Sequence, residues 1–232
     1  MTPGPLVDPG TVPCWLAPLV CGAAQLSATD LSRVPLPPAG IGRRAAVLLL
    51  LGADEATGEP DVLLQRRSAG LSSHAGQVSF PGGAVDEGDD GPVAAALREA
   101  AEEVGVHPGD VRPVALLPEV YVPPSNFRVA PVIAHWERPG PVSPVDPAET
   151  AAVARVPLSM LADPANRLTV PGREDWRFPA FLLPGMLVWG FTGGLVHAVL
   201  RMGGWERPWD AERVEDLDTA WRLAEELSLI HI

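Results

Sequence analysis

Three glutamates, Glu99, Glu102 and Glu103, stand close together in a segment whose neighbours favour a helix. On a helix of about 100° per residue, their spacing of three and four positions brings the carboxylates within reach of one another. Arg98 is the only cation between positions 92 and 104, so the negative charges are poorly balanced. Carboxylate oxygens are the ligands that Mg²⁺ and Mn²⁺ prefer. The spacing is therefore typical of either a divalent cation site or a solvated acidic face.

The helix that carries these glutamates is expected to run from about Pro92 to Val104. Acidic residues and Gly91 precede the proline and form a start signal, and Gly105 ends the helix. The carboxylates then lie near the helix C-terminus, where the helix dipole disfavours negative charge. The helical period predicts a core face made of Ala94, Leu97, Ala101 and Val104. The three carboxylates are expected on the side opposite this face.

Apolar runs and turn signals predict the elements around that helix. Strands are expected over 45–51, 62–64, 77–80, 111–117 and 127–135, a short helix over 158–161, and an amphipathic C-terminal helix over 210–229. The first two strands flank a polar turn and are expected to pair as a hairpin. Residues 1–40 are rich in proline and read as an N-terminal extension and linker.

The composition narrows the classes of function. A 47% hydrophobic fraction in 232 residues argues against disorder and allows a sizeable core. A formal net charge of −12 disfavours nucleic acid as the main partner, because phosphate binding needs a basic surface. If the substrate is anionic, metal ions and local arginines must make the electrostatic potential at the site positive.

Several features bear on the compartment. Cys14 and Cys21, buried or incidental, match no common zinc pattern and imply no disulfide framework, so a reducing cytoplasm is expected. The N-terminus lacks a basic segment followed by an apolar run, so no signal peptide is expected. The stretch from Phe178 to Leu200 has no charged residue and is long enough to span a bilayer. Repeated proline and glycine favour buried strands and turns there, and no membrane partner.

A wider motif surrounds the glutamates. Gly83 is followed by Arg98-Glu99-Ala100-Ala101-Glu102-Glu103-Val104-Gly105-Val106. This resembles the Nudix box, G-x5-E-x7-R-E-U-x-E-E-x-G-U, in which U is an apolar residue. The distal half fits. The proximal half is one residue longer, and Asp89 or Asp90 replaces the mid-box glutamate.

The segment before the box is similar to the signature of the coenzyme A pyrophosphatase branch of the Nudix hydrolase family, L-L-T-x-R-[SA]-x3-R-x3-G-x3-F-P-G-G. That branch also carries the longer box. The matching positions are Leu63, Leu64, Arg67, Ser68, Gly76 and 80–83. Gln65 stands in place of the threonine and Ser72 in place of the second arginine. Loss of that arginine removes a cation that could bind a substrate phosphate.

The resemblance continues downstream over about residues 44–200. Asp146-Pro147-Ala148-Glu149, the Val156-Pro157-Leu158 segment and Val188-Trp189-Gly190-Phe191-Thr192 are similar to further segments of the branch. The resemblance implies an α/β fold, a Nudix-type α/β/α sandwich with a mixed β-sheet. The expected organisation is a Nudix hydrolase domain over 41–205 and a C-terminal helix, 206–232, packed on it.

The resemblance also implies roles for single residues. Glu99, Glu102, Glu103 and the Gly82 carbonyl are the expected ligands of Mg²⁺ or Mn²⁺. One of these glutamates, or Glu149, is expected to act as general base.

Other roles concern the substrate. Arg98 is expected to orient a glutamate, and Arg67 to contact a phosphate. His74 is either a catalytic residue or a hydrogen-bonded loop residue, and Gln77 either contacts substrate or satisfies loop backbone. Trp189 reads as a core residue, with an adenine platform as the alternative.

The implied activity is metal-dependent hydrolysis of the pyrophosphate bond of coenzyme A or a derivative, which yields 3′,5′-ADP and a 4′-phosphopantetheine fragment. A Nudix pyrophosphatase for another dinucleotide or nucleotide conjugate is the alternative, and a non-catalytic Nudix-fold binding module is a remote one. The expected partner is a small-molecule nucleotide. The sequence does not determine the oligomeric state, and a homodimer is one possibility.

Overall fold

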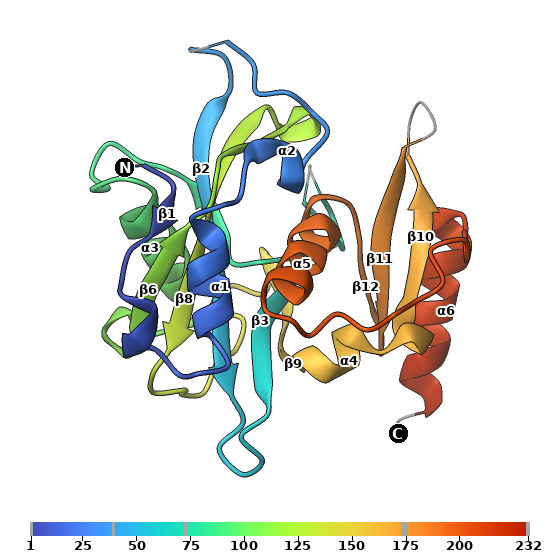
Figure 1. The fold of residues 1–232 in the computed structure, drawn as a ribbon. Coiled ribbons are helices and arrows are strands. Elements are labelled where there is room, and N and C mark those ends of the chain that lie inside the picture. Colours follow the sequence, from blue (N-terminus) through green and yellow to red (C-terminus); the bar gives the residue numbers. More distant parts are fainter. Residues whose placement is uncertain (1, 39, 72–73, 173–175, 231–232) are drawn as a thin grey trace.

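The computed structural model describes residues 2–38, 40–71, 74–172 and 176–230. Within these residues a large mixed sheet has the strand order β1-β6-β8-β2-β3-β4, with β5 beside β2, β7 beside β8 and β9 beside β3 (Figure 1). The β2–β8 pair is parallel and the other neighbours are antiparallel. The strands are β1 (Gly4–Pro5), β2 (Arg43–Ala53), β3 (Pro60–Arg67), β4 (Val78–Ser79), β5 (Gly82–Ala84), β6 (Val111–Leu116), β7 (Val120–Val122), β8 (Phe127–Trp136) and β9 (Thr150–Pro157).

Strand β2 runs through the middle of this sheet and is covered on both faces. Its side chains alternate between two separate cores: Ala46, Leu48 and Leu50 enter one, and Leu49 and Leu51 enter the other. Burial on both faces explains why the sequence reads as an unbroken apolar run. The predicted strand is thus confirmed, and so is its hairpin with β3, in which Leu51 lies opposite Val62.

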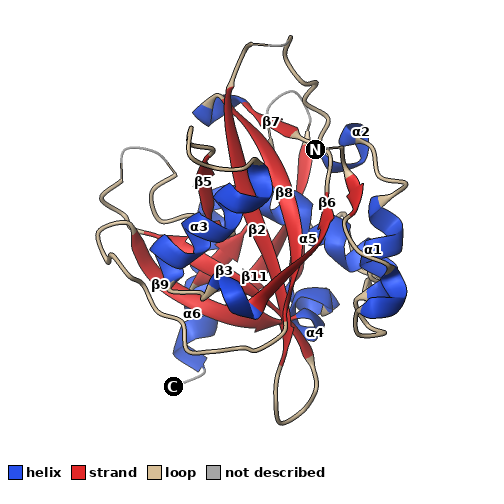
Figure 2. Cartoon of the chain, turned by 90° about the vertical axis from the view of Figure 1, so that its left-hand side faces the viewer, coloured by secondary structure: helices blue, strands red, loops and turns tan. Residues whose placement is uncertain are grey.

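Helix α3 (Pro92–Val104) covers the first face of the sheet (Figure 2). The predicted bounds are confirmed. Pro92 occupies the first turn, and Gly105 follows the helix in the left-handed conformation, with φ of 75°. Ala95, Ala96, Ala100 and Val104 pack onto Ala46, Leu48 and Leu50 of β2.

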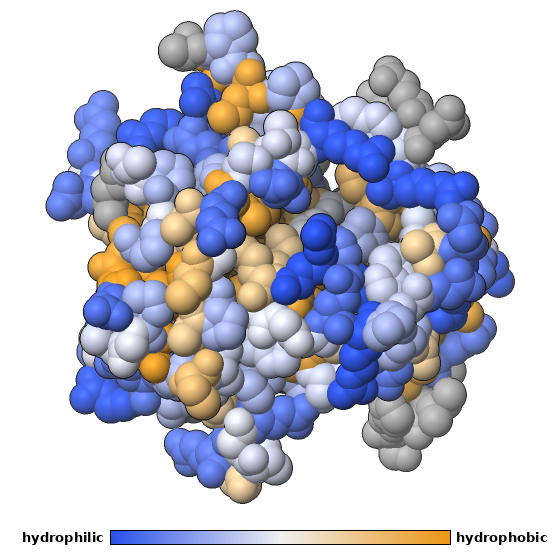
Figure 3. Space-filling view, viewed as in Figure 1, coloured by the Kyte–Doolittle hydropathy of each residue, from blue (hydrophilic) through white to orange (hydrophobic). Residues whose placement is uncertain are grey.

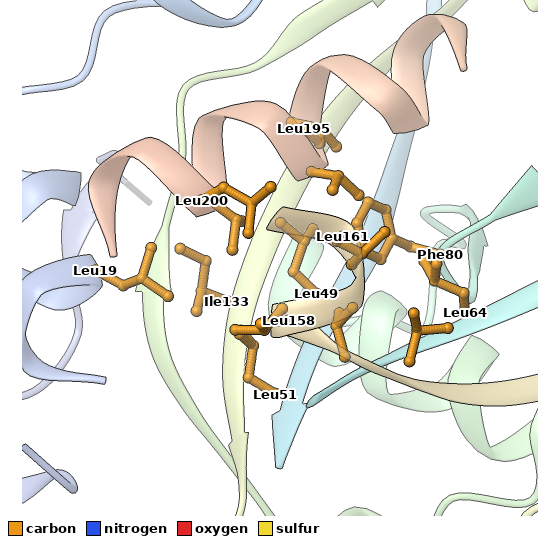
Figure 4. Packing of buried hydrophobic residues seen from close by; sticks show 14 of the residues in the cluster. Leu19, Leu49, Leu51, Leu64, Phe80, Ile133, Leu158, Leu161, Leu195 and Leu200 are labelled. Atoms are coloured by element: carbon orange, nitrogen blue, oxygen red, sulfur yellow. The ribbon is translucent and has the colours of Figure 1, made fainter. Parts of the chain in front are cut away.

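The second face of the sheet is covered by α1 (Ala17–Ala23), α4 (Leu158–Ala162) and α5 (Gly190–Met202). Figure 4 shows Leu19, Leu158, Leu195 and Leu200 converging on the β2 side chains Leu49 and Leu51. Segment 1–40, read from sequence as an extension and linker, therefore supplies part of this core. Its β1 pairs with β6, and α2 (Ala28–Leu31) lies beside α5.

A smaller sheet follows the main one in sequence, with the order β10-β11-β12. Its strands are β10 (Arg167–Pro171), β11 (Arg177–Leu183) and β12 (Met186–Val188). On β11, Phe181 and Leu183 pack towards α5, whereas Ala180 and Leu182 pack towards α6 (Leu217–Ile230). The small sheet therefore lies between α5 and α6, as Figure 1 shows.

The uncharged stretch from Phe178 to Leu200 was expected to form strands and turns. Strands β11 and β12 confirm this prediction for the first half of the stretch. The prediction is wrong for the second half, because Gly190–Met202 is a helix. A uniformly apolar run carries no period that would separate a buried helix from a buried strand. Gly193 lets this helix approach β11, since a Cβ there would lie 2.5 Å from the Pro179 carbonyl oxygen. Among the described residues, no helix is both long and apolar enough to cross a membrane.

The C-terminal helix begins at Leu217, seven residues after the expected start at Asp210. Residues before it pair with the edge of the small sheet: the Thr169 N–H donates to the Arg213 carbonyl, and the Glu215 N–H donates to the Thr169 carbonyl. Backbone groups engaged with a strand are not free for helical bonds. On the face of Figure 1, hydrophilic residues cover the region where this segment crosses the small sheet (Figure 3).

The remaining expected elements are present with small shifts. The 77–80, 111–117 and 127–135 strands correspond to β4, β6 and β8, and the 158–161 helix corresponds to α4. Short 3₁₀ turns occur at Pro9–Thr11, Pro108–Asp110, Pro123–Ser125 and Pro164–Asn166. Cys14 and Cys21 are free and exposed, so a buried cysteine pair is wrong and an incidental one remains.

Replacement of Leu19 by alanine tests whether the N-terminal segment stabilises the fold. Leu19 is fully buried against the second face of the sheet. We expect Leu19→Ala to lower the free energy of unfolding by about 2–5 kcal/mol, through lost apolar burial and the cavity left behind. Urea denaturation of the full chain measures this. Ile41→Ala, at a position 49% exposed, is the control and should change stability by less than about 0.5 kcal/mol. Equal effects would show that 1–40 is a dispensable extension.

Candidate active site

The site is built where the end of α3 meets the short strand β5. Gly82 and Gly83 open β5, and β5 pairs with β2 through Ala46 and Val47. Gly82 has φ of 153°, and a Cβ there would lie 2.2 Å from the Ala46 carbonyl oxygen. Only glycine therefore allows this approach of the two strands. It also leaves the Gly82 N–H directed at a carboxylate of α3.

That carboxylate is Glu103. It is 8% exposed and accepts two hydrogen bonds on Oε2, one from Gln65 Nε2 at 2.7 Å and one from the Gly82 N–H at 2.8 Å. Arg67 Nη1 lies 3.6 Å from its Oε1. Burial raises the pKa of Glu103 to about 7, although the two hydrogen bonds and Arg67 act in the opposite direction. Glu99 adds to the rise by like-charge repulsion.

The position of Glu103 corrects the expected orientation of the helix. Ala95, Ala96 and Ala100 are fully buried, whereas Ala94, Leu97 and Ala101 of the expected core face are only partly buried. The helix is rotated so that Glu103 points into the protein, and Glu99 lies at the margin of the buried face. The prediction failed because small apolar residues occur around much of this helix, so periodicity alone gave no single face.

Glu99 lies directly over β5. A Cβ on Gly83 would come within 2.5–2.7 Å of the Glu99 carboxylate oxygens, so the second glycine clears the space that this side chain fills. Burial raises the pKa of Glu99, while Arg98 opposes the rise. Glu99 and Glu103 thus form a pair of neighbouring carboxylates, both shielded from water, beside two consecutive glycines.

Arg98 organises the outer side of the site. Its guanidinium donates to both carboxylate oxygens of Asp89 at 3.0 Å and to the Ala84 carbonyl at 3.0 Å. Its Nη1 lies 2.9 Å from Glu102 Oε2 and 3.2 Å from Glu99 Oε1. Of the two aspartates in the mid-box position, Asp89 is therefore the one that forms hydrogen bonds with Arg98. Asp89, Glu99 and Glu102 raise the pKa of Arg98. The arrangement agrees with an orienting role for Arg98.

Glu102 lies apart from the other two glutamates, with a side chain 59% exposed. Glu149 is also exposed; its backbone carbonyl accepts the Ser68 N–H at 2.8 Å, beside Arg67. The structure therefore brings Glu99, Glu103 and Gly82 together and leaves the carboxylates of Glu102 and Glu149 in contact with solvent.

Gln65 is a site residue that the sequence alone did not single out. It is fully buried on β3, and its side chain connects Glu103 to Thr150, whose Oγ1 donates to Gln65 Oε1 at 3.1 Å. The available signal was a polar residue after the apolar run Val62 to Leu64, because a buried amide needs partners. Gln65 was noted instead as a departure from the family signature.

The other sequence-predicted residues lie on the β3 side of the site. The Arg67 N–H donates to the Gln77 carbonyl at 2.9 Å, and the Gln77 side chain bonds to His74 Nδ1 at 2.9 Å. His74 has φ of 54°. The His74–Gln77 contact makes His74 a hydrogen-bonded loop residue and joins the Gln77 side chain to another side chain. Ser72 lies outside the described residues.

Glu99 and Glu103 interact electrostatically, but a complete ligand set is not assembled among the described residues. Among the described residues, no three His, Cys, Asp or Glu side chains converge on one metal position. The donor chemistry nevertheless fits Mg²⁺ or Mn²⁺, because Glu99 and Glu103 are oxygen donors whose charges are costly without a counter-ion. Glu102 would have to leave Arg98 to join them.

Comparison with known proteins identifies the family of the chain. The sequence model of the NUDIX domain matches residues 42–175, which is more than half of the chain. The chain therefore belongs to the Nudix family, and its activity is that of a Nudix hydrolase. Members of this family generally use divalent metals such as Mg²⁺ or Mn²⁺.

Three relatives illustrate the range of similarity. NudL of Citrobacter koseri, an uncharacterized Nudix hydrolase, is 36% identical over 180 residues, which cover 74% of this chain and 89% of that protein. NudL of Cronobacter sakazakii is 40% identical over 186 residues, covering 79% and 94%. Nudix hydrolase 15, mitochondrial, of Arabidopsis thaliana is 34% identical over 164 residues, covering 66% and 56%.

The Nudix hydrolase RenU of M. smegmatis is 21% identical with a TM-score of 0.48, and the match covers 72% of this chain and 89% of that one.

The raised pKa of Glu103 predicts how the metal-free protein responds to pH. Between about pH 4.5 and pH 7 the folded state holds a proton that the unfolded chain has lost. The free energy of unfolding should therefore fall as pH rises through this window, by on the order of 3 kcal/mol from this group. Glu103→Gln removes the group, so the stability of the wild type relative to the variant should fall by that amount.

Urea denaturation with excess chelator, from about pH 5 to about pH 8, measures this difference. Asp54→Asn, at an exposed hairpin position, controls for loss of a carboxylate as such. A stability difference between wild type and Glu103→Gln that stays constant with pH would show that Glu103 titrates normally.

Proposed function

We propose that the chain hydrolyses the pyrophosphate bond of coenzyme A or a coenzyme A derivative and needs Mg²⁺ or Mn²⁺. The observation that carries the catalytic part is the buried Glu103 carboxylate, held by Gln65 and Gly82 beside Glu99. A carboxylate kept out of water at the end of the family helix has a clear use as a ligand for a cation that activates a phosphate ester.

The substrate assignment rests on the segment from Leu63 to Gly83, which resembles the coenzyme A pyrophosphatase signature. Arg67 of this segment lies 3.6 Å from Glu103 and pairs through its backbone with Gln77. Arg67 Nε is buried and has no hydrogen-bond partner among the described residues. The Arg67 side chain is nevertheless 26% exposed, and a partly exposed guanidinium beside the carboxylates is suited to a phosphate oxygen.

Hydrolysis requires a water to attack one phosphorus and the bridging P–O bond to break. Glu99 and Glu103 would hold a divalent cation, which would supply charge neutralisation and lower the pKa of the attacking water. Arg67 holds a phosphate oxygen, and Arg98 keeps Glu99 in place through its contact at 3.2 Å. The proton of the water passes to one of Glu99, Glu103 and Glu149. The products from coenzyme A are 3′,5′-ADP and 4′-phosphopantetheine.

A Nudix pyrophosphatase for another dinucleotide or nucleotide conjugate is the second candidate. Ser72 favours it, because the signature has an arginine at that position. An arginine there would provide a charged hydrogen bond to a phosphate, worth about 1.5–3 kcal/mol. If another cation of the chain takes its place, Arg43, Arg44 and Arg66 are the candidates.

Glu103→Gln tests the catalytic assignment. The amide keeps the shape of the side chain but loses its charge, so kcat should fall by at least about 100-fold without unfolding. Hydrolysis measured by mass spectrometry of the products, with circular dichroism of the variant, checks this. Wild type in excess chelator should also be inactive. The exposed Glu137→Gln is the matched control and should keep wild-type kcat. Full activity of Glu103→Gln would exclude the mechanism.

A substrate panel tests the specificity. We expect kcat/KM for coenzyme A to exceed the values for NADH, ADP-ribose and diadenosine polyphosphates. The 3′-dephospho form should have a comparable kcat/KM to coenzyme A, because the arginine that could read the 3′-phosphate is missing. A much lower value for the dephospho form would show that another cation reads this phosphate. No turnover of either, with rapid cleavage of a different dinucleotide, would leave a Nudix enzyme with another substrate.

A further inference from the structure

A cavity of about 500 Å³ opens beside the carboxylate site, where the main and small sheets meet. Its walls come from Arg66 and Arg67 of β3, Gln77 of the following loop, Trp189 after β12, and Leu217 and Trp221 of α6. Small residues form the rest of the lining. The volume lies within the range of small-molecule sites, about 300–1,000 Å³. The cavity shares Arg67 with the carboxylate site, because this side chain lies 3.6 Å from Glu103.

We propose that this cavity holds the planar base of the nucleotide substrate, with Trp189 and Trp221 as its aromatic walls. The proposal rests on the proposed function, since it places the pyrophosphate at Arg67. Both indoles are only partly buried and line the cavity, so they present aromatic surface to it. Stacking on indole rings is a general way to bind a base, because every base has a π-face.

The charges of the cavity suit a base that carries a phosphate. The chain is strongly acidic, with a formal net charge of −12, yet two arginines line this one cavity. Arg66 is already engaged, since its Nη1 donates to the Gly185 carbonyl at 3.2 Å. Arg67 Nε has no hydrogen-bond partner among the described residues. A phosphate at Arg67 would therefore lie between Glu103 on one side and the tryptophans on the other.

The α6 wall is held to the main sheet by a short series of hydrogen bonds. Arg66 of β3 binds the Gly185 carbonyl, and the Gly185 N–H donates to the Ala224 carbonyl of α6 at 2.8 Å. This connection fixes the position of α6, and therefore that of Trp221, relative to β3. Trp221 lies outside residues 42–175, which the family model matches, and outside the segments that resemble the coenzyme A pyrophosphatase branch, whereas Trp189 belongs to one of those segments. The α6 side of the base-binding wall is thus supplied by the C-terminal region.

The opposite half of coenzyme A is a worse match to the same cavity. A pantetheine arm is a flexible, extended chain, so it would lose much conformational freedom and gain little from flat aromatic faces. A base is rigid and planar and loses little freedom when it stacks. The cavity therefore favours the nucleotide half of the substrate.

Binding of substrate fragments to the full-length chain in excess chelator tests the proposal without turnover. The probes are adenosine 5′-monophosphate, ribose 5-phosphate, which lacks the base, and 4′-phosphopantetheine, the other half. Titrations followed by NMR of the indole N–H groups report on each tryptophan. We expect adenosine 5′-monophosphate to shift the Trp189 and Trp221 signals and to bind more tightly than the other two probes.

Substitutions locate the effect. Trp221→Ala should raise the Kd for adenosine 5′-monophosphate about five-fold or more and leave that for ribose 5-phosphate unchanged. Trp221→Phe keeps an aromatic face and should recover most of the affinity, which separates stacking from a loss of fold. Trp176→Ala is the matched control, since Trp176 is a partly buried indole of the small-sheet region that contacts Phe178.

Several outcomes would overturn the proposal. Equal Kd values for adenosine 5′-monophosphate and ribose 5-phosphate would show that no base is bound. Shifts of the Trp221 signal by 4′-phosphopantetheine alone would assign the cavity to the other half of the substrate. If adenosine 5′-monophosphate binds as expected but coenzyme A is not hydrolysed, the base site stands and the substrate assignment fails. If coenzyme A is hydrolysed and Trp221→Ala changes neither Kd nor KM, the base site fails and the proposed function stands.

Discussion

The burial of the Glu103 carboxylate is the constraint on which the site and its surroundings depend. A charged carboxylate removed from water costs several kcal/mol unless donors replace the lost hydration. Its two hydrogen bonds come from Gln65 and the Gly82 N–H, on strands far apart in sequence from each other and from the helix. Strands β3 and β5 must therefore hold one register relative to α3. The glycine at position 82 is needed because any side chain there would collide with β2.

The distribution of charge explains how an acidic chain can act on an anionic substrate. Arg98 is surrounded by Asp89, Glu99 and Glu102, so its charge is balanced within the protein and serves to position carboxylates. Within the part of the chain that the structure describes, Arg67 pairs with one carboxylate, Glu103, at the longer distance of 3.6 Å. The two arginines of the site therefore differ in their surroundings: Arg98 is enclosed by acids, and Arg67 has a side chain that is 26% exposed.

The small sheet and α6 form a second layered unit, which contacts the first through Phe181 and Leu183 of β11. Arg167 is fully buried, with its guanidinium 4.1 Å from the Trp209 ring centroid and 5.1 Å from that of Phe181, and it bonds to Glu206. This arrangement fixes the segment that leads from α5 to α6. Burial lowers the pKa of Arg167, and Glu206 opposes the change. The attached unit completes a cavity that the residues of the Nudix motif do not enclose by themselves.

The sequence alone determined the local elements and the chemistry of the catalytic helix. The strand β2, the bounds of α3 and the identity of the family motif follow from short-range signals: apolar runs, proline and glycine positions, and spacing of charges. Tertiary structure decided which face of α3 is buried, that Gln65 supports Glu103, and that Trp221 and Arg67 line one cavity. It also turned Gly190–Met202 into a helix. These features depend on contacts between residues far apart in the chain, and a periodic pattern of small or uniformly apolar residues does not specify which neighbour will cover which side.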